Sequence, residues 1–165
     1  MKSLIAKIKS LIKPDSIKVD PDIFDDITEN FLDTINFNRP SDIKDIKSRN
    51  LFYLIDLHTQ VQGGGLLSFV DNGTGIYFNE VKNALKEFKL SNYLELFQKI
   101  ESLFPNQKIP DNNLEIRDYF DKVNDEESSF YINLEEFWGN IDNTFYNNLE
   151  SFRHTVIVNI KNNVA

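Results

Sequence analysis

Residues 20–35, DPDIFDDITENFLDTI, carry the strongest indication of fold class in this chain. Asp20 followed by Pro21 is typical of a helix start, with Asp as the N-cap and Pro at the first helical position. Apolar side chains then recur at the spacing of one helix face. They are Ile23, Phe24, Ile27, Phe31 and Ile35. The stretch therefore predicts an amphipathic helix with one buried face.

The same helical spacing continues along most of the chain. Pro40 and Ser41 predict a second helix with Ser41 as its cap. The glycines at 63–65 predict its end, because glycine accepts the left-handed backbone that a helix terminus needs. Asp71-Asn72-Gly73 is a turn signal, and a loop is expected from Pro105 to Pro110. Further helices are expected over 76–90, 91–104, 116–123 and 134–152.

The tail at 155–158, TVIV, is rich in β-branched residues, which are common in strands. A lone strand needs a pairing partner and none is evident, so we expect this segment to be helical. We therefore predict an all-α fold, a single compact domain of about seven helices.

Composition limits the function classes. The chain has 165 residues, no cysteine, 18 Lys and Arg against 26 Asp and Glu, and a net charge of −8. Such a charge repels a phosphate backbone, so direct nucleic-acid binding is not expected. The absence of cysteine excludes a disulfide framework and fits a cytoplasmic protein. No apolar run is long enough to predict a transmembrane helix.

The first 13 residues, MKSLIAKIKSLIK, differ from the rest, since they carry four lysines and no acid. We separate them as a basic amphipathic helix over 1–13, followed by an acidic helical domain over 14–165. Such a helix could pack on the domain or on a second subunit, which we favour, or lie on an anionic membrane surface.

Enzyme signatures are missing from the sequence. His58 lies among apolar helical positions and is expected to pack in the core. The glycines at 63–65 follow a helix and lack the Lys-Ser/Thr of a phosphate loop. Asp71-Asn72-Gly73 lacks the other ligands of a calcium loop. We therefore expect no catalytic residue, no cofactor and no bound metal.

Carboxylates are the organised feature of the sequence. One row lies opposite the apolar face of the helix over 20–35, within an arc of about 100°. The positive end of a helix explains acids in the first turn, but not those further along. The row is Asp22, Asp25, Asp26, Glu29 and Asp33.

A second acidic block occupies residues 111–150, which contain eleven acidic residues and only two basic ones. Three of its acids share a helix face, three follow in a loop, and four are expected on one side of the helix over 134–152. Since like charges repel within a fold, a surface this acidic favours a basic partner. The candidate partner-binding residues are Asp111, Glu115, Asp118, Asp125, Glu126, Glu127, Glu135, Glu136, Asp142 and Glu150.

The stretch VQGGGLLSFVDNGTG over 61–75 resembles the signature of a bacterial family of small helical proteins that includes a DNA mimic. Gly63 and Ser68 replace the family's Asn and Gln, and Val70 replaces an aromatic residue. The resemblance extends over roughly 45–163. The matching positions are Gly64, Gly65, Leu66, Phe69, Asn72 and Gly75.

This resemblance implies an acidic homodimer whose carboxylates imitate DNA phosphates and occupy the DNA-binding site of a basic protein such as a transcription factor. The glycine-rich stretch itself is expected to be structural. An immunity or antitoxin-like inhibitor of a basic toxin or nuclease is the main alternative. A membrane-surface adaptor and an enzyme with an unrecognised carboxylate site are the others.

Overall fold

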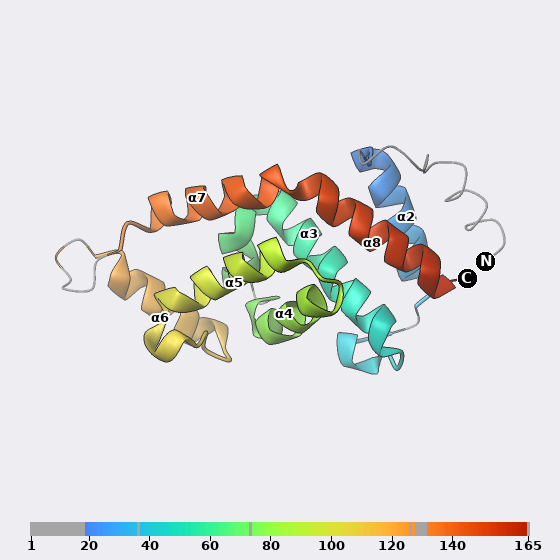
Figure 1. Ribbon diagram of the computed structural model, residues 1–165. Coiled ribbons are helices and arrows are strands. Elements are labelled where there is room, and N and C mark those ends of the chain that lie inside the picture. The colour runs from blue at the N-terminus through green and yellow to red at the C-terminus, as the bar shows by residue number, and fades with distance from the viewer. Residues whose placement is uncertain (1–18, 36, 73, 126, 128–131, 165) are drawn as a thin grey trace. The chain divides into compact units, whose positions relative to one another are not determined.

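A computed structural model describes residues 19–35, 37–72, 74–125, 127 and 132–164, and these residues form seven α-helices and no β-strand (Figure 1). The prediction of an all-α fold is confirmed. The predicted helix over 1–13 lies outside the described residues. The helices are α2 (Pro21–Asp33), α3 (Ile46–Asp71), α4 (Phe78–Glu87), α5 (Ser91–Leu103), α6 (Asn113–Val123), α7 (Leu134–Asn147) and α8 (Leu149–Val164). Short 3-10 helices span Pro40–Asp42, Thr74–Tyr77 and Pro105–Gln107.

The chain divides into two compact units. Among the described residues, one contains those up to Ile55 together with those from Asn148 onward, and the other contains those within Asp56–Asn147. Since the acidic rows of the sequence fall in both, each unit is described in turn.

In the first unit, α2 packs along α8 (Figure 1). The predicted start of α2 is confirmed, since the Asp20 carboxylate accepts a 2.9 Å hydrogen bond from the Asp22 N–H. Phe24, Ile27 and Phe31 are buried, while the outer positions of the predicted stripe are only half-buried. Burial of these side chains from water is what holds α2 in place.

The predicted helix start at Ser41 is wrong. Pro40–Asp42 is a short 3-10 helix, and the backbone is extended at Ile43 before α3 begins at Ile46. Asp45 takes the capping role instead, because its carboxylate accepts a 2.7 Å hydrogen bond from the Ser48 N–H. Hydrogen bonds from Ser48 lower the pKa of Asp45, as expected for a cap that favours the ionised form.

The glycines at 63–65 break α3 but do not end it. Gly65 has φ 76° and ψ −178°, a backbone that residues with a side chain rarely adopt. The predicted positive φ is therefore present, but ψ is extended rather than that of a left-handed helix, and the chain resumes a helical path and continues to Asp71. The apolar segment that follows is helical and buries Leu66, Phe69 and Val70.

The second unit has an aromatic core between α4, α5 and the last part of α3. The ring centroids of Phe78 and Phe97 are 4.5 Å apart, and Phe69 lies 5.8 Å from Phe97. At the edge of this core, the Lys82 ammonium on α4 contacts the Glu101 carboxylate on α5 at 2.5 Å. These contacts join two neighbouring helices, both of which the sequence predicted from the spacing of its apolar residues.

The single helix predicted over 134–152 is two helices, which is a correction to the sequence analysis. It breaks at Asn148, whose carbonyl accepts a 3.2 Å hydrogen bond from the Phe152 N–H at the start of α8. Asparagine favours helix starts, and two occur in succession at 147–148. The tail at 155–158 is helical within α8, as predicted.

Candidate partner-binding surfaces

The acidic row on α2 is exposed. All five of its carboxylates lie on the solvent side of the helix, opposite the buried Phe24 and Phe31. Residues 20–35 contain no lysine or arginine, so the row has no basic residue on its own helix. The five are Asp22, Asp25, Asp26, Glu29 and Asp33.

In the second unit, two acids near the start of α6 contact neighbouring side chains, and a third is exposed. Asn112 accepts a 2.9 Å hydrogen bond from the Glu115 N–H and donates to the Glu115 carboxylate at 2.5 Å. Asp111 forms an exposed 3.3 Å ion pair with Lys108. Asp118 is exposed on the next turn of α6.

Several acids beyond the middle of α6 are also exposed. Asp125 and Glu127 lie beyond its end, and Glu135 and Glu136 lie in the first turn of α7. Glu126 falls outside the described residues. Asp121 is exposed one turn after Asp118 and was not among the sequence candidates, although its spacing places it on the same side of α6.

Two of the sequence candidates accept hydrogen bonds from residues distant in the sequence. Asp142 is half-buried, and its Oδ1 atom accepts a 2.8 Å hydrogen bond from the Leu66 N–H. Glu150 lies on α8, in the first unit, where it accepts a 2.8 Å hydrogen bond from the Val19 N–H. Since the helix break separates Glu150 from Glu135 and Glu136, these acids do not share one helix face.

The carboxyl group of Asp142 is partly desolvated. Burial raises the pKa of its carboxyl group, and the hydrogen bond from Leu66 only partly offsets this effect. A Cβ atom added at Gly65 would contact this carboxylate. Asp142 therefore lies directly against the glycine break of α3.

The matching positions of the glycine-rich stretch have internal roles in the second unit. Leu66 and Phe69 are fully buried. The Asn72 amide donates a 2.7 Å hydrogen bond to the Ser68 hydroxyl. A Cβ atom at Gly75 would meet the Val70 carbonyl, so only glycine fits there. Gly64 and Gly65 form the break itself.

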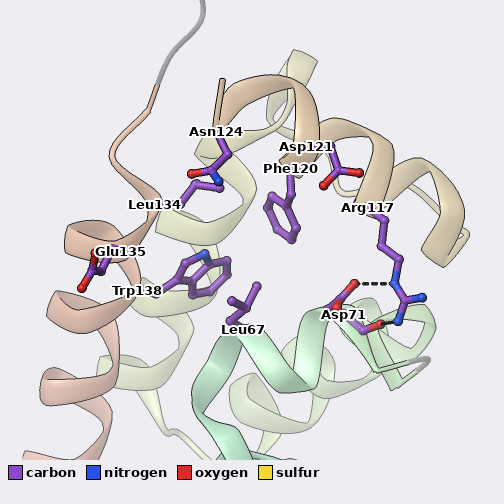
Figure 2. Close-up of a pocket in the computed structure, with 9 residues that line it drawn as sticks. All are labelled: Leu67, Asp71, Arg117, Phe120, Asp121, Asn124, Leu134, Glu135 and Trp138. Atoms are coloured by element: carbon purple, nitrogen blue, oxygen red, sulfur yellow. Dashed lines mark hydrogen bonds and ion pairs between the residues drawn. The ribbon is translucent and has the colours of Figure 1, made fainter. Parts of the chain in front are cut away.

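A pocket of about 610 Å³ opens between the last turns of α3, α6 and the start of α7 (Figure 2). Its apolar lining is Leu67, Phe120, Leu134 and Trp138. Its polar lining is Asp71, Arg117, Asp121, Asn124 and Glu135. Sequence analysis did not find this site, because its residues come from three helices separated by up to 71 positions.

The polar edge of this pocket contains one ion pair. Arg117 donates to the Asp71 carboxylate at 2.8 Å and to the Asp71 carbonyl at 3.2 Å, and Figure 2 shows both bonds. Its guanidinium group is therefore already paired within the chain. The remaining carboxylates of the pocket, Asp121 and Glu135, are exposed.

His58 is buried in the second unit, as the sequence predicted. Within the described ranges, no group of three His, Asp or Glu side chains could hold a metal ion. No helix of this part of the chain is long and apolar enough to cross a membrane.

Fold and surface together define a small all-helical protein with acidic faces. The chain belongs to the DMP19-like protein family, whose model matches residues 42–162. This match covers nearly the same residues as the resemblance over 45–163. No curated protein and no solved structure matches the chain.

Proposed function

We propose that this protein is a non-enzymatic DNA mimic that occupies the DNA-binding site of a basic protein such as a transcription factor. Membership of the DMP19-like family is compatible with this role. The observation that carries the proposal is the uninterrupted row of exposed carboxylates on α2.

The charge spacing of this row supports the proposal. From Asp22 to Asp33 the five carboxylates span about 16 Å, given a rise of about 1.5 Å per residue. They therefore present one negative charge per about 4 Å. Each strand of duplex DNA carries one phosphate per about 3.4 Å of helix axis. A groove lined with lysine and arginine that tracks a phosphate strand would meet a similar density of charge on α2.

The exposed acids around α6 and the start of α7 add a second acidic surface, in the other unit. We include Asp118, Asp121, Glu135 and Glu136 in the proposed contact region. Asp142 and Glu150 are left out of it, because their carboxylates are hydrogen-bonded within the chain.

Competition with DNA tests this function. The protein is immobilised, its partners are captured from the native host and identified, and each purified partner is titrated with the protein and with duplex DNA. We expect duplex DNA and the protein to displace each other, and the affinity to fall steeply as salt rises.

The double variant Glu29→Gln/Asp33→Asn removes two charges from the α2 row and should weaken binding several-fold. The control Glu80→Gln/Glu95→Gln removes two exposed charges from α4 and α5 and should bind like the parent. A partner that holds DNA and this protein at the same time would contradict mimicry. It would favour an inhibitor of a basic toxin or nuclease instead.

A further inference from the structure

The pocket between α3, α6 and α7, called the Trp138 pocket below, has an apolar floor beneath an acidic edge. Leu67 remains 37% exposed on this floor, although Leu66 before it and Phe69 and Val70 after it are buried. Phe120 and Trp138 meet edge to face, with ring centroids 5.9 Å apart. A volume of about 610 Å³ is within the range of sites that bind small molecules or protruding side chains.

One buried donor on this floor lacks a partner. Trp138 is 5% exposed, and its indole Nε1–H has no hydrogen-bond acceptor in the structure. Figure 2 shows the indole nitrogen on the edge of the ring that faces Leu134 and Asn124, which also line the pocket. Buried tryptophan N–H groups usually find a partner. A ligand with an acceptor such as a backbone carbonyl would supply it.

The charge of the pocket selects for a cation. Its lining contains three carboxylates and one guanidinium group, and the guanidinium of Arg117 is bound to Asp71. Asp121 and Glu135 are left as exposed carboxylates beside the apolar floor. A ligand that complements this site combines an apolar group, a hydrogen-bond acceptor and positive charge.

We propose that the Trp138 pocket anchors a basic peptide segment of the partner protein. An aliphatic side chain of the segment fills the apolar floor, and a backbone carbonyl accepts the Trp138 Nε1–H. Flanking lysine or arginine side chains pair with Asp121 and Glu135. The inference rests on the proposed function in one respect, which is that the partner is basic. It adds a specific anchor to a surface that otherwise binds by charge alone.

The chain contains a single tryptophan, so its fluorescence reports directly on this pocket. We would titrate the full chain with three capped hexapeptides: Lys-Lys-Leu-Leu-Lys-Lys, Glu-Glu-Leu-Leu-Glu-Glu and Lys-Lys-Ser-Ser-Lys-Lys. Only the first combines an apolar centre with positive flanks. We expect a saturable change in emission with this peptide, and at least tenfold weaker responses with the other two. Equal responses to all three, or no response to any, would overturn the proposal.

Matched variants locate the binding site. Asp121→Asn/Glu135→Gln removes the two charges of the pocket edge and should weaken the first peptide about three- to tenfold. Glu80→Gln/Glu95→Gln removes two exposed charges from α4 and α5, outside the pocket lining, and should change affinity less than twofold. Trp138→Phe keeps an aromatic ring without the N–H and should weaken binding in calorimetry. Equal losses in both double variants would show a diffuse acidic surface and overturn the assignment.

Three further outcomes separate this proposal from its alternatives. If emission changes with protein concentration alone, in step with dimer formation by light scattering, a second copy fills the pocket and the proposal fails. If the peptide binds but duplex DNA does not displace the protein from its partner, the DNA-mimic function is refuted and the pocket assignment stands. DNA competition without peptide binding would refute the pocket assignment alone.

Discussion

Asp142 on α7 holds Leu66 at the point where α3 resumes after its glycine break, through a 2.8 Å hydrogen bond from the Leu66 N–H to the Asp142 carboxylate. One turn further along α7, the Tyr146 hydroxyl donates a 2.8 Å hydrogen bond to the Val61 carbonyl, which precedes the break. In an unbroken helix these backbone groups would bond to residues four positions away along α3. Two side chains of α7, four residues apart, therefore form hydrogen bonds with the backbone on the two sides of the break.

Substitutions at Asp142 should separate its hydrogen bond from its charge. Asp142→Asn keeps an acceptor for the Leu66 N–H, whereas Asp142→Ala leaves this N–H without one. We expect Asp142→Ala to lower the free energy of unfolding by about 1–3 kcal/mol. Chemical denaturation of both variants measures the difference. An alanine variant as stable as the parent would show that the contact contributes nothing.

The difference in stability between the parent and Asp142→Asn should depend on pH. Burial raises the pKa of Asp142 in the fold, so ionisation costs the native state more than the unfolded chain. The parent should lose stability relative to Asp142→Asn as pH rises from about 4 through the raised pKa. The two proteins should unfold alike near pH 3, and the Asn variant should be more stable at pH 7. A parent that is the more stable one at pH 7 would contradict this sign.

Gly65→Ala should be strongly destabilising. The backbone at Gly65 has φ 76°, and an added Cβ atom would contact the Asp142 carboxylate. We expect a loss of about 2–3 kcal/mol in thermal or chemical unfolding. Gly63→Ala is the control, because its Cβ atom would meet nothing within 4 Å. This exposed helical position should gain up to about 1 kcal/mol.

The contact between Lys82 and Glu101 should show strong coupling in a double-mutant cycle. Their side chains are 25% and 14% exposed, so removal of one partner leaves a partly buried charge. Lys82→Met and Glu101→Gln should each cost about 1–3 kcal/mol, and the double variant less than their sum. Urea unfolding of the four proteins gives the coupling energy, and simple additivity would show that the pair is not coupled.

Glu29→Lys should affect stability and partner binding in opposite directions. Glu29 lies four residues from both Asp25 and Asp33, so lysine would replace two repulsive pairs with attractive ones. The melting temperature should rise by an amount equivalent to about 1 kcal/mol, while partner binding weakens. If stability rises and binding is unchanged, the α2 row is only a solvated helix face. Glu95→Lys, an exposed change on α5, controls for net charge.

The dimer remains a prediction of the sequence. It rests on the family resemblance and on the aromatic fraction of 13%, with 14 phenylalanines. Many of these phenylalanines, such as Phe69, Phe78 and Phe97, are buried within the chain and are therefore not available to a second copy. Light scattering at tens of micromolar should give a species of about twice 19.3 kDa. A single 19.3 kDa species at physiological salt would contradict it.

Local signals in the sequence were sufficient for most helices. The cap at Asp20 and the apolar spacing of α2 and α5 depend on neighbours within a few residues, and these predictions are confirmed. The errors occur where two local signals compete. Ser41 and Asp45 are both good caps, and only the path of the chain between them selects Asp45.

The candidate site was predictable only where it depends on one helix. Periodicity places the α2 acids on the exposed face without knowledge of the rest of the fold. Asp142 has the same periodicity as Glu135, yet its partner Leu66 lies 76 residues away in the sequence. The Trp138 pocket depends on three helices that meet only in the folded chain. No local pattern could have indicated either feature.

The close approach of Gly65 to Asp142 has an evolutionary consequence. A side chain at position 65 and a carboxylate at position 142 compete for the same space, so neither site can change freely while the other stays fixed. Relatives that carry a larger residue at 65 should therefore carry a smaller one at 142. We expect these two positions to covary across the DMP19-like family, whereas position 63, which faces open space, should drift independently of both.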